Sequence, residues 1–296
     1  MNTIVTTGQR SATPLPATLR LGPVHLTVSD LTRSVAWYES TLGLRVHSRD
    51  EDAATVVLGD GTRPVLVLVE ERGARAAGRH AGLYHYALLY PSREELARAA
   101  VRLMIQRTPI QGASDHGTHE AIYLPDPDGN GIELAADRPR EQWPSPEEEF
   151  GRGGPLPLDV ENLLATVAGE DPSPTVATGL RVGHLHLHVG SIDEGLAFYR
   201  DLIGFDVWAL IPTAAFVSAG GYHHHLGFNV WRGTGVPPAP FHTVGLRHWT
   251  VQLDTPDEVS EVRERVESAG VAVEEAANGF LVRDPWGIAL RVEVAS

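Results

Sequence analysis

The chain contains four copies of one structural unit, and this internal repetition narrows the folds it can adopt more than any other feature. Segment 34–46 carries Trp-Tyr followed by Leu-Gly-Leu, and segment 195–207 carries Phe-Tyr followed by Ile-Gly-Phe at the same spacing. A second pattern, a strand that begins with His and a later Asp-Pro-x-Gly turn, occurs at 85–129 and again at 248–287. Such repeats indicate duplication, so equivalent positions can be compared within one sequence.

Composition and charge exclude several classes of function. The net charge of −14, with no lysine and no run of arginines, argues against a nucleic-acid partner, because phosphate binding needs clustered cations. The absence of cysteine removes disulfides, thiolate nucleophiles and Cys-ligated metals, which leaves His, Asp and Glu as metal ligands. No segment resembles a signal peptide or a membrane span, so we expect a cytoplasmic protein without a membrane partner. We also expect a homo-oligomer.

The 296 residues are enough for two domains of ordinary size. We expect a flexible tail at 1–19, a first domain at 20–137, a linker at 138–180 and a second domain at 181–296. The linker is rich in Pro, Glu and Gly and has one short helix candidate near Asp159. Each domain is expected to hold two β-α-β-β-β units, which makes the fold class α+β.

Histidines are concentrated in the strand that opens the third unit. Three of them alternate with apolar residues and therefore share one face of the strand, namely His184, His186 and His188. We expect one ligand and two bystanders among them. The aromatic pairs of the first and third units are instead expected to be helix-to-sheet core.

The Trp-Tyr and Phe-Tyr segments, with the closing Asp-Pro-Asp-Gly-Asn-Gly-Ile-Glu at 126–133, resemble the vicinal oxygen chelate superfamily. Its members include glyoxalases, antibiotic-resistance proteins and extradiol ring-cleaving dioxygenases. The likeness covers residues from about 20 to 294, and the four-unit length resembles the catechol 2,3-dioxygenase branch. The resemblance implies that the four units pair into two half-open sheet cups. It also implies a metal whose ligands come from first and last strands of the units.

The resemblance implies that the second and third units hold the metal. The ligand positions of the second unit are occupied by His85 and Glu133, and the first-strand position of the third unit by His184. Two neutral imidazoles and one carboxylate form the facial triad that suits non-haem Fe(II), with open positions for substrate and O2. Mn(II) would also fit.

The other two units supply an incomplete set. The equivalent positions of the fourth unit are His248 and Arg291, and the first unit has Pro23 there, with His25 two residues further on. We therefore infer that the second unit pairs with the third and the first with the fourth, an exchange that the long linker permits. If units paired in sequence order, His25 would instead join the two ligands of the second unit. We expect His248 and Arg291 to be a structural pair.

The resemblance also implies acid–base residues around the metal. Extradiol enzymes carry a catalytic Tyr ten residues before the ligand Glu, and Tyr123 lies ten residues before Glu133. They carry a His shortly before that Tyr, for which His116 is the first choice and His119 the reserve. They also carry a His pair before an apolar residue and Phe in the third unit, and His224 aligns best with their acid–base residue.

The run of histidines at 223–225 has a second interpretation as a solvated loop. If the run is extended, neighbouring side chains point in opposite directions, so only His224 or its two flanking residues can face a pocket. A His near its ordinary pKa can accept and return the protons that a catechol must lose to bind through both oxygens.

The resemblance implies an Fe(II)-dependent extradiol dioxygenase of aromatic catabolism, with a catechol-type diol and O2 as its small-molecule partners. One alternative is a glyoxalase-type metal-dependent isomerase or transferase, which would not require Tyr123 and His224. The other is an aromatic-ligand-binding resistance protein of the same fold. That protein would not need His85, His184 and Glu133 together.

Overall fold

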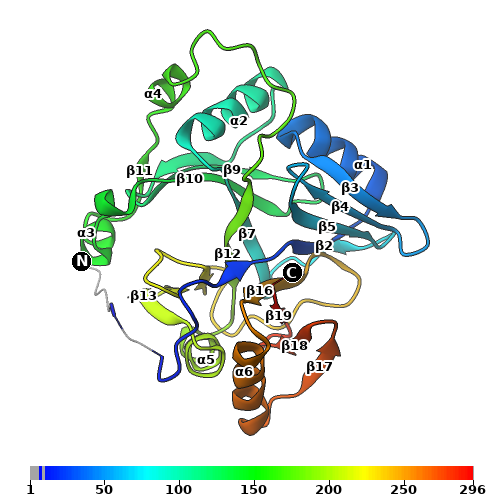
Figure 1. Cartoon of the computed structure of the whole chain (residues 1–296), viewed down its shortest axis with the longest axis vertical. Helices are drawn as coiled ribbons and strands as arrows, with labels where there is room; N and C mark the ends of the chain where they lie inside the picture. Colours follow the sequence, from blue (N-terminus) through cyan, green and yellow to red (C-terminus); the bar gives the residue numbers. More distant parts are fainter. Residues whose placement is uncertain (1–6, 9–10, 296) are drawn as a thin grey trace.

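The computed structural model describes residues 7–8 and 11–295, and its strands form two large sheets (Figure 1). The nine-stranded sheet has the order β11 (Leu156–Pro157), β8 (Gly112–Asp115), β9 (His119–Pro125), β10 (Gly131–Asp137), β7 (Gly82–Leu89), β12 (Arg181–His188), β15 (Leu226–Asn229), β14 (Ala214–Ser218) and β13 (Asp206–Ile211).

The ten-stranded sheet has the order β17 (Val273–Ala276), β18 (Gly279–Arg283), β19 (Ala289–Val294), β16 (Thr243–Leu253), β2 (Val24–Val28), β5 (Pro64–Glu70), β4 (Thr55–Gly59) and β3 (Arg45–Asp50). Two short strands, β1 (Arg20–Leu21) and β6 (Arg75–Ala76), also pair with β16. The helices are α1 (Leu31–Trp37), η1 (Tyr38–Leu42), α2 (Arg93–Ile105), η2 (Arg140–Gln142), α3 (Pro146–Gly151), α4 (Val160–Ala165), α5 (Ile192–Leu196), η3 (Ala197–Ile203) and α6 (Pro256–Ser268).

Each sheet combines one unit from each half of the chain. Strand β7 of the second unit pairs antiparallel with β12 of the third, with His85 opposite His186. Strand β2 of the first unit pairs antiparallel with β16 of the fourth, with His25 opposite His248. The expected α+β fold of four paired units is confirmed, and so is the exchanged pairing of second with third and first with fourth.

The helices of units that are neighbours in the sequence pack together, whereas the strands of those units belong to different sheets. Helix α2 of the second unit packs against η1 of the first, and α6 of the fourth unit packs against η3 of the third. Figure 1 shows α1 and α2 near one end of the molecule and α5 and α6 near the other. Each half of the chain therefore contributes to both sheets while its own helices stay together.

Buried Tyr–Asp hydrogen bonds link the two units within each half. The Tyr38 hydroxyl donates to Asp126 at 3.0 Å, and the Tyr199 hydroxyl donates to Asp284 at 2.8 Å. The repeated Tyr of the first pattern and the repeated Asp of the second are therefore hydrogen-bond partners. The aromatic pairs are buried core as expected, except that Trp37 is only partly buried. In each half of the chain, the Asp of the Asp-Pro-x-Gly turn thus accepts a hydrogen bond from a helix of the preceding unit.

We expect Tyr199→Phe to lower the free energy of unfolding by about 1–3 kcal/mol, because it leaves the buried Oδ2 atom of Asp284 without its donor, while two backbone N–H groups still donate to Oδ1. Burial raises the pKa of Asp284 to about 6, and the Tyr199 hydrogen bond opposes that rise. Urea unfolding followed by fluorescence would measure the change. Tyr84→Phe is the matched control, since the Tyr84 side chain is 41% exposed, and we expect it to change stability by less than about 0.5 kcal/mol. Equal effects of the two variants would contradict the proposed contribution of the Tyr–Asp bond.

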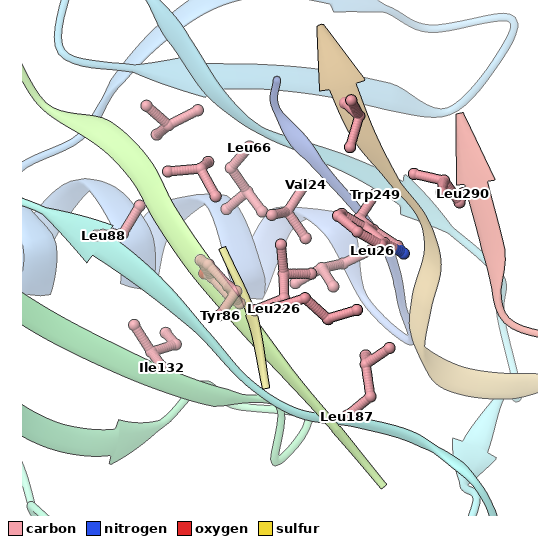
Figure 2. Packing of buried hydrophobic residues seen from close by; sticks show 14 of the residues in the cluster. Val24, Leu26, Leu66, Tyr86, Leu88, Ile132, Leu187, Leu226, Trp249 and Leu290 are labelled. Carbon is pink, nitrogen blue, oxygen red and sulfur yellow. The ribbon is translucent and has the colours of Figure 1, made fainter. Parts of the chain in front are cut away.

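One apolar core joins the two sheets. Figure 2 shows Tyr86 and Leu226 of the nine-stranded sheet in the same packed cluster as Leu26, Trp249 and Leu290 of the ten-stranded sheet. All five are 0% exposed. Because alternate residues of a strand point to opposite faces, the inward residues of both sheets fill this core and the outward ones are free to line a cavity.

The linker and the tail are more ordered than the sequence suggests. The expected helix after Asp159 is α4, but the linker also contains α3 and η2, and its strand β11 joins the nine-stranded sheet beside β8. Residues 1–6 and 9–10 of the expected flexible tail lie outside the described residues. Its remaining part is anchored on the third unit, because Leu15 and Leu19 are buried and the Leu15 N–H donates to the Gly204 carbonyl. The domain boundaries themselves stay a prediction.

Among the described residues, none of the helices is both long and apolar enough to span a bilayer.

Candidate metal centre

Three side chains predicted as ligands converge on one buried point. The Glu133 Oε2 atom lies 3.1 Å from His85 Nε2 and 3.1 Å from His184 Nε2. Their candidate ligand atoms all lie within 4.8 Å of one another, and each residue is at most 7% exposed. In the part of the chain that the structure describes, this is the one group of His, Asp or Glu residues that meets these distances.

The sheet pairing explains the convergence. Strands β7 and β10 are parallel neighbours, and β12 runs antiparallel on the other side of β7. The residues that face away from the core on these strands therefore share one surface. The β7–β12 ladder has irregularities between Val182 and Leu185 and between His186 and Leu187. Irregularities of this kind re-aim side chains next to functional sites.

The donor set fits a divalent cation. Donors about 2.1 Å from an ion and at right angles to one another lie about 3 Å apart, close to the separations between Glu133 Oε2 and the two imidazoles. Burial raises the pKa of Glu133, but the surrounding imidazoles outweigh burial and hold the pKa of this carboxyl well below its ordinary value. The carboxylate is therefore charged, and two imidazoles and one carboxylate are ligands suited to non-haem iron or manganese.

Tyr123 and His116 lie together beside this cluster. Tyr123 is opposite Glu133 in the β9–β10 ladder, and its hydroxyl lies 2.7 Å from His116 Nε2. Burial, followed by the charge of Glu133, raises the pKa of Tyr123 well above its ordinary value, so the hydroxyl keeps its proton. Burial also lowers the pKa of His116 and favours its neutral form.

His119, the reserve choice, has a different position. Its Nε2 atom lies 3.0 Å from Glu133 Oε1, the carboxylate oxygen that the two candidate ligands do not contact. Its ring stacks on His116 at 4.3 Å and on His223 at 4.6 Å. The geometry therefore suits His116 as the partner of Tyr123 and His119 as the residue that orients the Glu133 carboxylate.

The His224 side chain lies against His184, one of the three candidate metal ligands, but is not itself one of the three. Its ring centroid lies 4.1 Å from that of His184. Burial, followed by the neighbouring imidazoles, lowers the pKa of His224 well below its ordinary value. A neutral imidazole at this place can accept a proton from a group bound at the cluster.

The expected alternation of the histidine run is wrong. Both His223 and His224 line the cavity, and their Nδ1 atoms lie 2.9 Å apart. The run lies in a turn before β15, with Gly220 and Gly221 at φ of 63° and 67°, so the two-residue period of a strand does not apply. His225 points elsewhere, and its Nδ1 accepts from the Ala219 N–H. The solvated-loop interpretation is also wrong, since His223 and His224 are buried.

The histidines of the other sheet do not reach the cluster. His25 stacks on His248 with ring centroids 3.8 Å apart, and both lie on strands of the ten-stranded sheet. The alternative ligand set that included His25 is therefore wrong. Arg291 on β19 lies next to Thr250 of β16, and its guanidinium pairs with Glu293 at 2.7 Å. Burial, followed by the Arg291 charge, lowers the pKa of His248 to about 4. Because His248 Nε2 has no hydrogen-bond partner among the described residues, the expected structural pair of His248 and Arg291 is wrong.

A cavity of about 530 Å³ contains the cluster and its neighbours. The three candidate ligands, Tyr123 and the histidines beside them line it, together with residues of the linker, of the strands of the second and third units and of the turn before β15. The lining residues are Tyr84, His85, Gln111, Gly112, Ser114, His116, Thr118, His119, Tyr123, Gly131, Ile132, Glu133, Glu149, Phe150, Gly153, Gly154, Pro155, His184, His186, Trp208, Ile211, Phe216, His223, His224 and Trp231.

The linker supplies one wall of the cavity, a role that was not predicted from the sequence. Helix α3 brings Glu149 and Phe150 to the cavity, and Glu149 Oε1 lies 3.6 Å from His116 Nδ1. The signal was present in the sequence as Ser145-Pro146-x-Glu148, a capping box with Pro at the first helical position, which predicts a helix start. His186, predicted as a bystander, also lines the cavity, and its Nε2 has no hydrogen-bond partner among the described residues.

The fold and the site define a protein whose paired β-α-β-β-β units enclose a His-His-Glu cluster that could hold a metal ion. Residues 20–134 and 181–292 match the model of the Glyoxalase/Bleomycin resistance protein/Dioxygenase superfamily. The chain belongs to this superfamily, as the sequence resemblance predicted.

Similarity to known proteins agrees with this membership. The chain is 40% identical over 269 residues to the catechol-2,3-dioxygenase of Bacillus subtilis (strain 168), which covers 90% of this chain and 93% of the relative. The solved glyoxalase I of Zea mays is 14% identical with a TM-score of 0.57, covering 94% of this chain and 92% of that one. The cppA protein of Streptococcus pneumoniae is 16% identical with a TM-score of 0.57, covering 99% and 100%. The two solved structures support the fold alone.

Proposed function

We propose that this chain is an extradiol ring-cleaving dioxygenase that uses Fe(II), or Mn(II), to open catechol-type aromatic diols with O2. The chain is an enzyme of the superfamily identified above, and its 40% identity to a catechol-2,3-dioxygenase supports the reaction class. The observation that carries the proposal is the His85–Glu133–His184 cluster in the wall of a cavity that Tyr123 and His224 also line. A role in aromatic catabolism and a cytoplasmic location stay predictions.

In this proposal His85, His184 and Glu133 hold the metal. When bound, the metal supplies a Lewis-acidic centre that lowers the pKa of the diol and brings it and O2 together. The buried Glu133 carboxylate would offset part of the positive charge of the metal. His119 orients that carboxylate through its contact with Oε1.

His224 and Tyr123 handle protons on the substrate. The neutral His224 ring, 4.1 Å from the His184 ring, takes a proton from a diol hydroxyl and later returns it. The protonated Tyr123 hydroxyl donates to oxygen on the substrate, and His116 at 2.7 Å holds that hydroxyl in place. The reaction places both atoms of O2 in the product, so it needs no external reductant.

A glyoxalase-type isomerase is the alternative that the fold permits. Such an isomerase would use the three metal ligands, but it would not require the Tyr123–His116 pair or the buried His224. A module that only sequesters an aromatic ligand would not need a His-His-Glu cluster. The cavity is lined by the His-His-Glu cluster, by the Tyr123–His116 pair and by His224, and this combination favours ring cleavage.

Oxygen uptake tests the proposal. We expect the Fe(II)-loaded protein to consume one O2 per catechol and to form a yellow ring-opened product. An oxygen electrode and the visible spectrum would follow both at once. Intact catechol and unconsumed O2 across a panel of substituted catechols would instead support the isomerase or the binding module.

A further inference from the structure

We infer that the ring substituent of the substrate is uncharged and apolar, and that the cavity disfavours diols bearing a carboxylate. This inference rests on the proposed ring cleavage and names the substrate class. It depends on the charges around the cavity, on the aromatic wall and on the place of the nearby arginines.

No arginine lines the cavity among the residues that the structure describes, and the chain has no lysine, so a carboxylate substituent would lack the partner that either side chain provides. The charged residues that do line it are Glu133 and Glu149, both at most 5% exposed. The Oε2 atom of Glu149 is buried and has no hydrogen-bond partner among the described residues. A further carboxylate brought into this space would be repelled and left without a partner, which is costly inside a protein.

The arginines on the surrounding elements are engaged elsewhere. Arg152, just after α3, donates to the His116 carbonyl at 3.1 Å. Arg138, just after β10, pairs with carboxylates of β8 and β9. Arg232, next to the cavity residue Trp231, donates to the His80 carbonyl at 3.0 Å. None of the three lines the cavity.

The wall that extends outward from His224 and His186 is a continuous series of aromatic rings. On one side, the Phe216 ring lies 5.3 Å from His224 and 5.3 Å from Phe150, and Trp208 lies 6.4 Å from Phe150. Ring contacts at these separations make a surface that excludes water and favours apolar groups.

On the other side, Tyr84 contacts His186 at 5.3 Å and Trp231 at 5.5 Å. Tyr84 and Trp231 are 41% and 51% exposed, so they form the mouth of the cavity. Large exposed aromatics at a pocket mouth are typical of a binding surface. The volume of about 530 Å³ falls among pockets that hold drug-sized ligands. A single dihydroxybenzene ring is smaller than such ligands, which leaves room for a substituent.

The relative efficiency with neutral and carboxylated diols tests the inference. We expect the neutral diol, methylcatechol, to be cleaved with a specificity constant about 10²-fold or more above that of dihydroxybenzoate and dihydroxyphenylacetate, the effect of burying an unpaired charge. Equal values for neutral and carboxylated diols would overturn the inference and leave ring cleavage intact. If no diol is cleaved, the proposed function fails, and anaerobic calorimetric titration of the metal-loaded protein with the same diols then decides the inference alone.

Ile211→Arg supplies the missing cation. Ile211 lines the cavity at the end of β13 and is partly exposed, so it tolerates a long side chain there. We expect this variant to shift the ratio of specificity constants toward dihydroxyphenylacetate and away from methylcatechol by at least about tenfold, through a charge-assisted hydrogen bond. Ile211→Gln, which introduces a polar but neutral side chain, should shift the ratio far less than Ile211→Arg. A ratio that does not move in Ile211→Arg, while the protein stays folded by circular dichroism, would overturn the inference that the substituent lies in this cavity without a cationic partner.

Discussion

Replacing Glu133 or His184 with alanine should abolish metal binding, whereas the unchanged protein should bind about one Fe(II) or Mn(II) per chain. Each substitution removes one of only three donors and leaves the other two unable to hold the ion. Glu133→Ala should also remove the contacts that the carboxylate makes with His85 and His184 in the metal-free protein. Metal content after anaerobic purification, measured by inductively coupled plasma mass spectrometry, gives the result directly.

His248→Ala is the matched control for this experiment. His248 holds the equivalent place in the fourth unit, but it stacks on His25 in the other sheet. We expect this variant to keep its metal. Retention of metal in His184→Ala together with its loss in His248→Ala would contradict the assignment of the site to the nine-stranded sheet.

His224→Ala should keep the metal and lower kcat by about 10²–10⁴-fold, the usual contribution of a general acid–base group. The imidazole lies against His184, but it is not among the three clustered ligands. Burial lowers its pKa well below the ordinary value expected from the sequence, so the imidazole is neutral and has a nitrogen free of a proton, although it is a weaker base than an exposed imidazole. Steady-state oxygen uptake at matched iron occupancy, measured across pH, would show the loss.

Two further variants separate proton handling from packing. Tyr123→Phe should reduce turnover more mildly than His224→Ala, since it removes one donor and preserves the ring. His225→Ala is the control for the histidine run, because His225 is adjacent in sequence but does not line the cavity. We expect it to keep most of the turnover. Wild-type rates in His224→Ala at every pH would remove this residue from the mechanism and direct attention to His116 and His223.

The repeat pattern, together with the ligand positions that the superfamily resemblance implies, predicted the fold class and the pairing of units. Glu133 and His184 have no counterpart at Arg291 and Pro23, so a complete ligand set required the second and third units to share a sheet. The strand ladders between β7 and β12 and between β2 and β16 have this pairing. The prediction succeeded because ligand chemistry restricts residue types at equivalent positions, and such restrictions are visible in a sequence.

Other features depended on contacts between segments far apart in the chain. The sequence determined which residue types were available: a His-His-Glu set, a Tyr ten residues before the Glu, and no cysteine. The tertiary structure decided that the linker helix brings Glu149 beside His116, and that His223 and His224 face the same cavity. Periodicity describes how neighbouring side chains alternate within one regular element. It carries no information about turns, or about which distant helix packs over a sheet, because those depend on the burial of apolar surface across the whole fold.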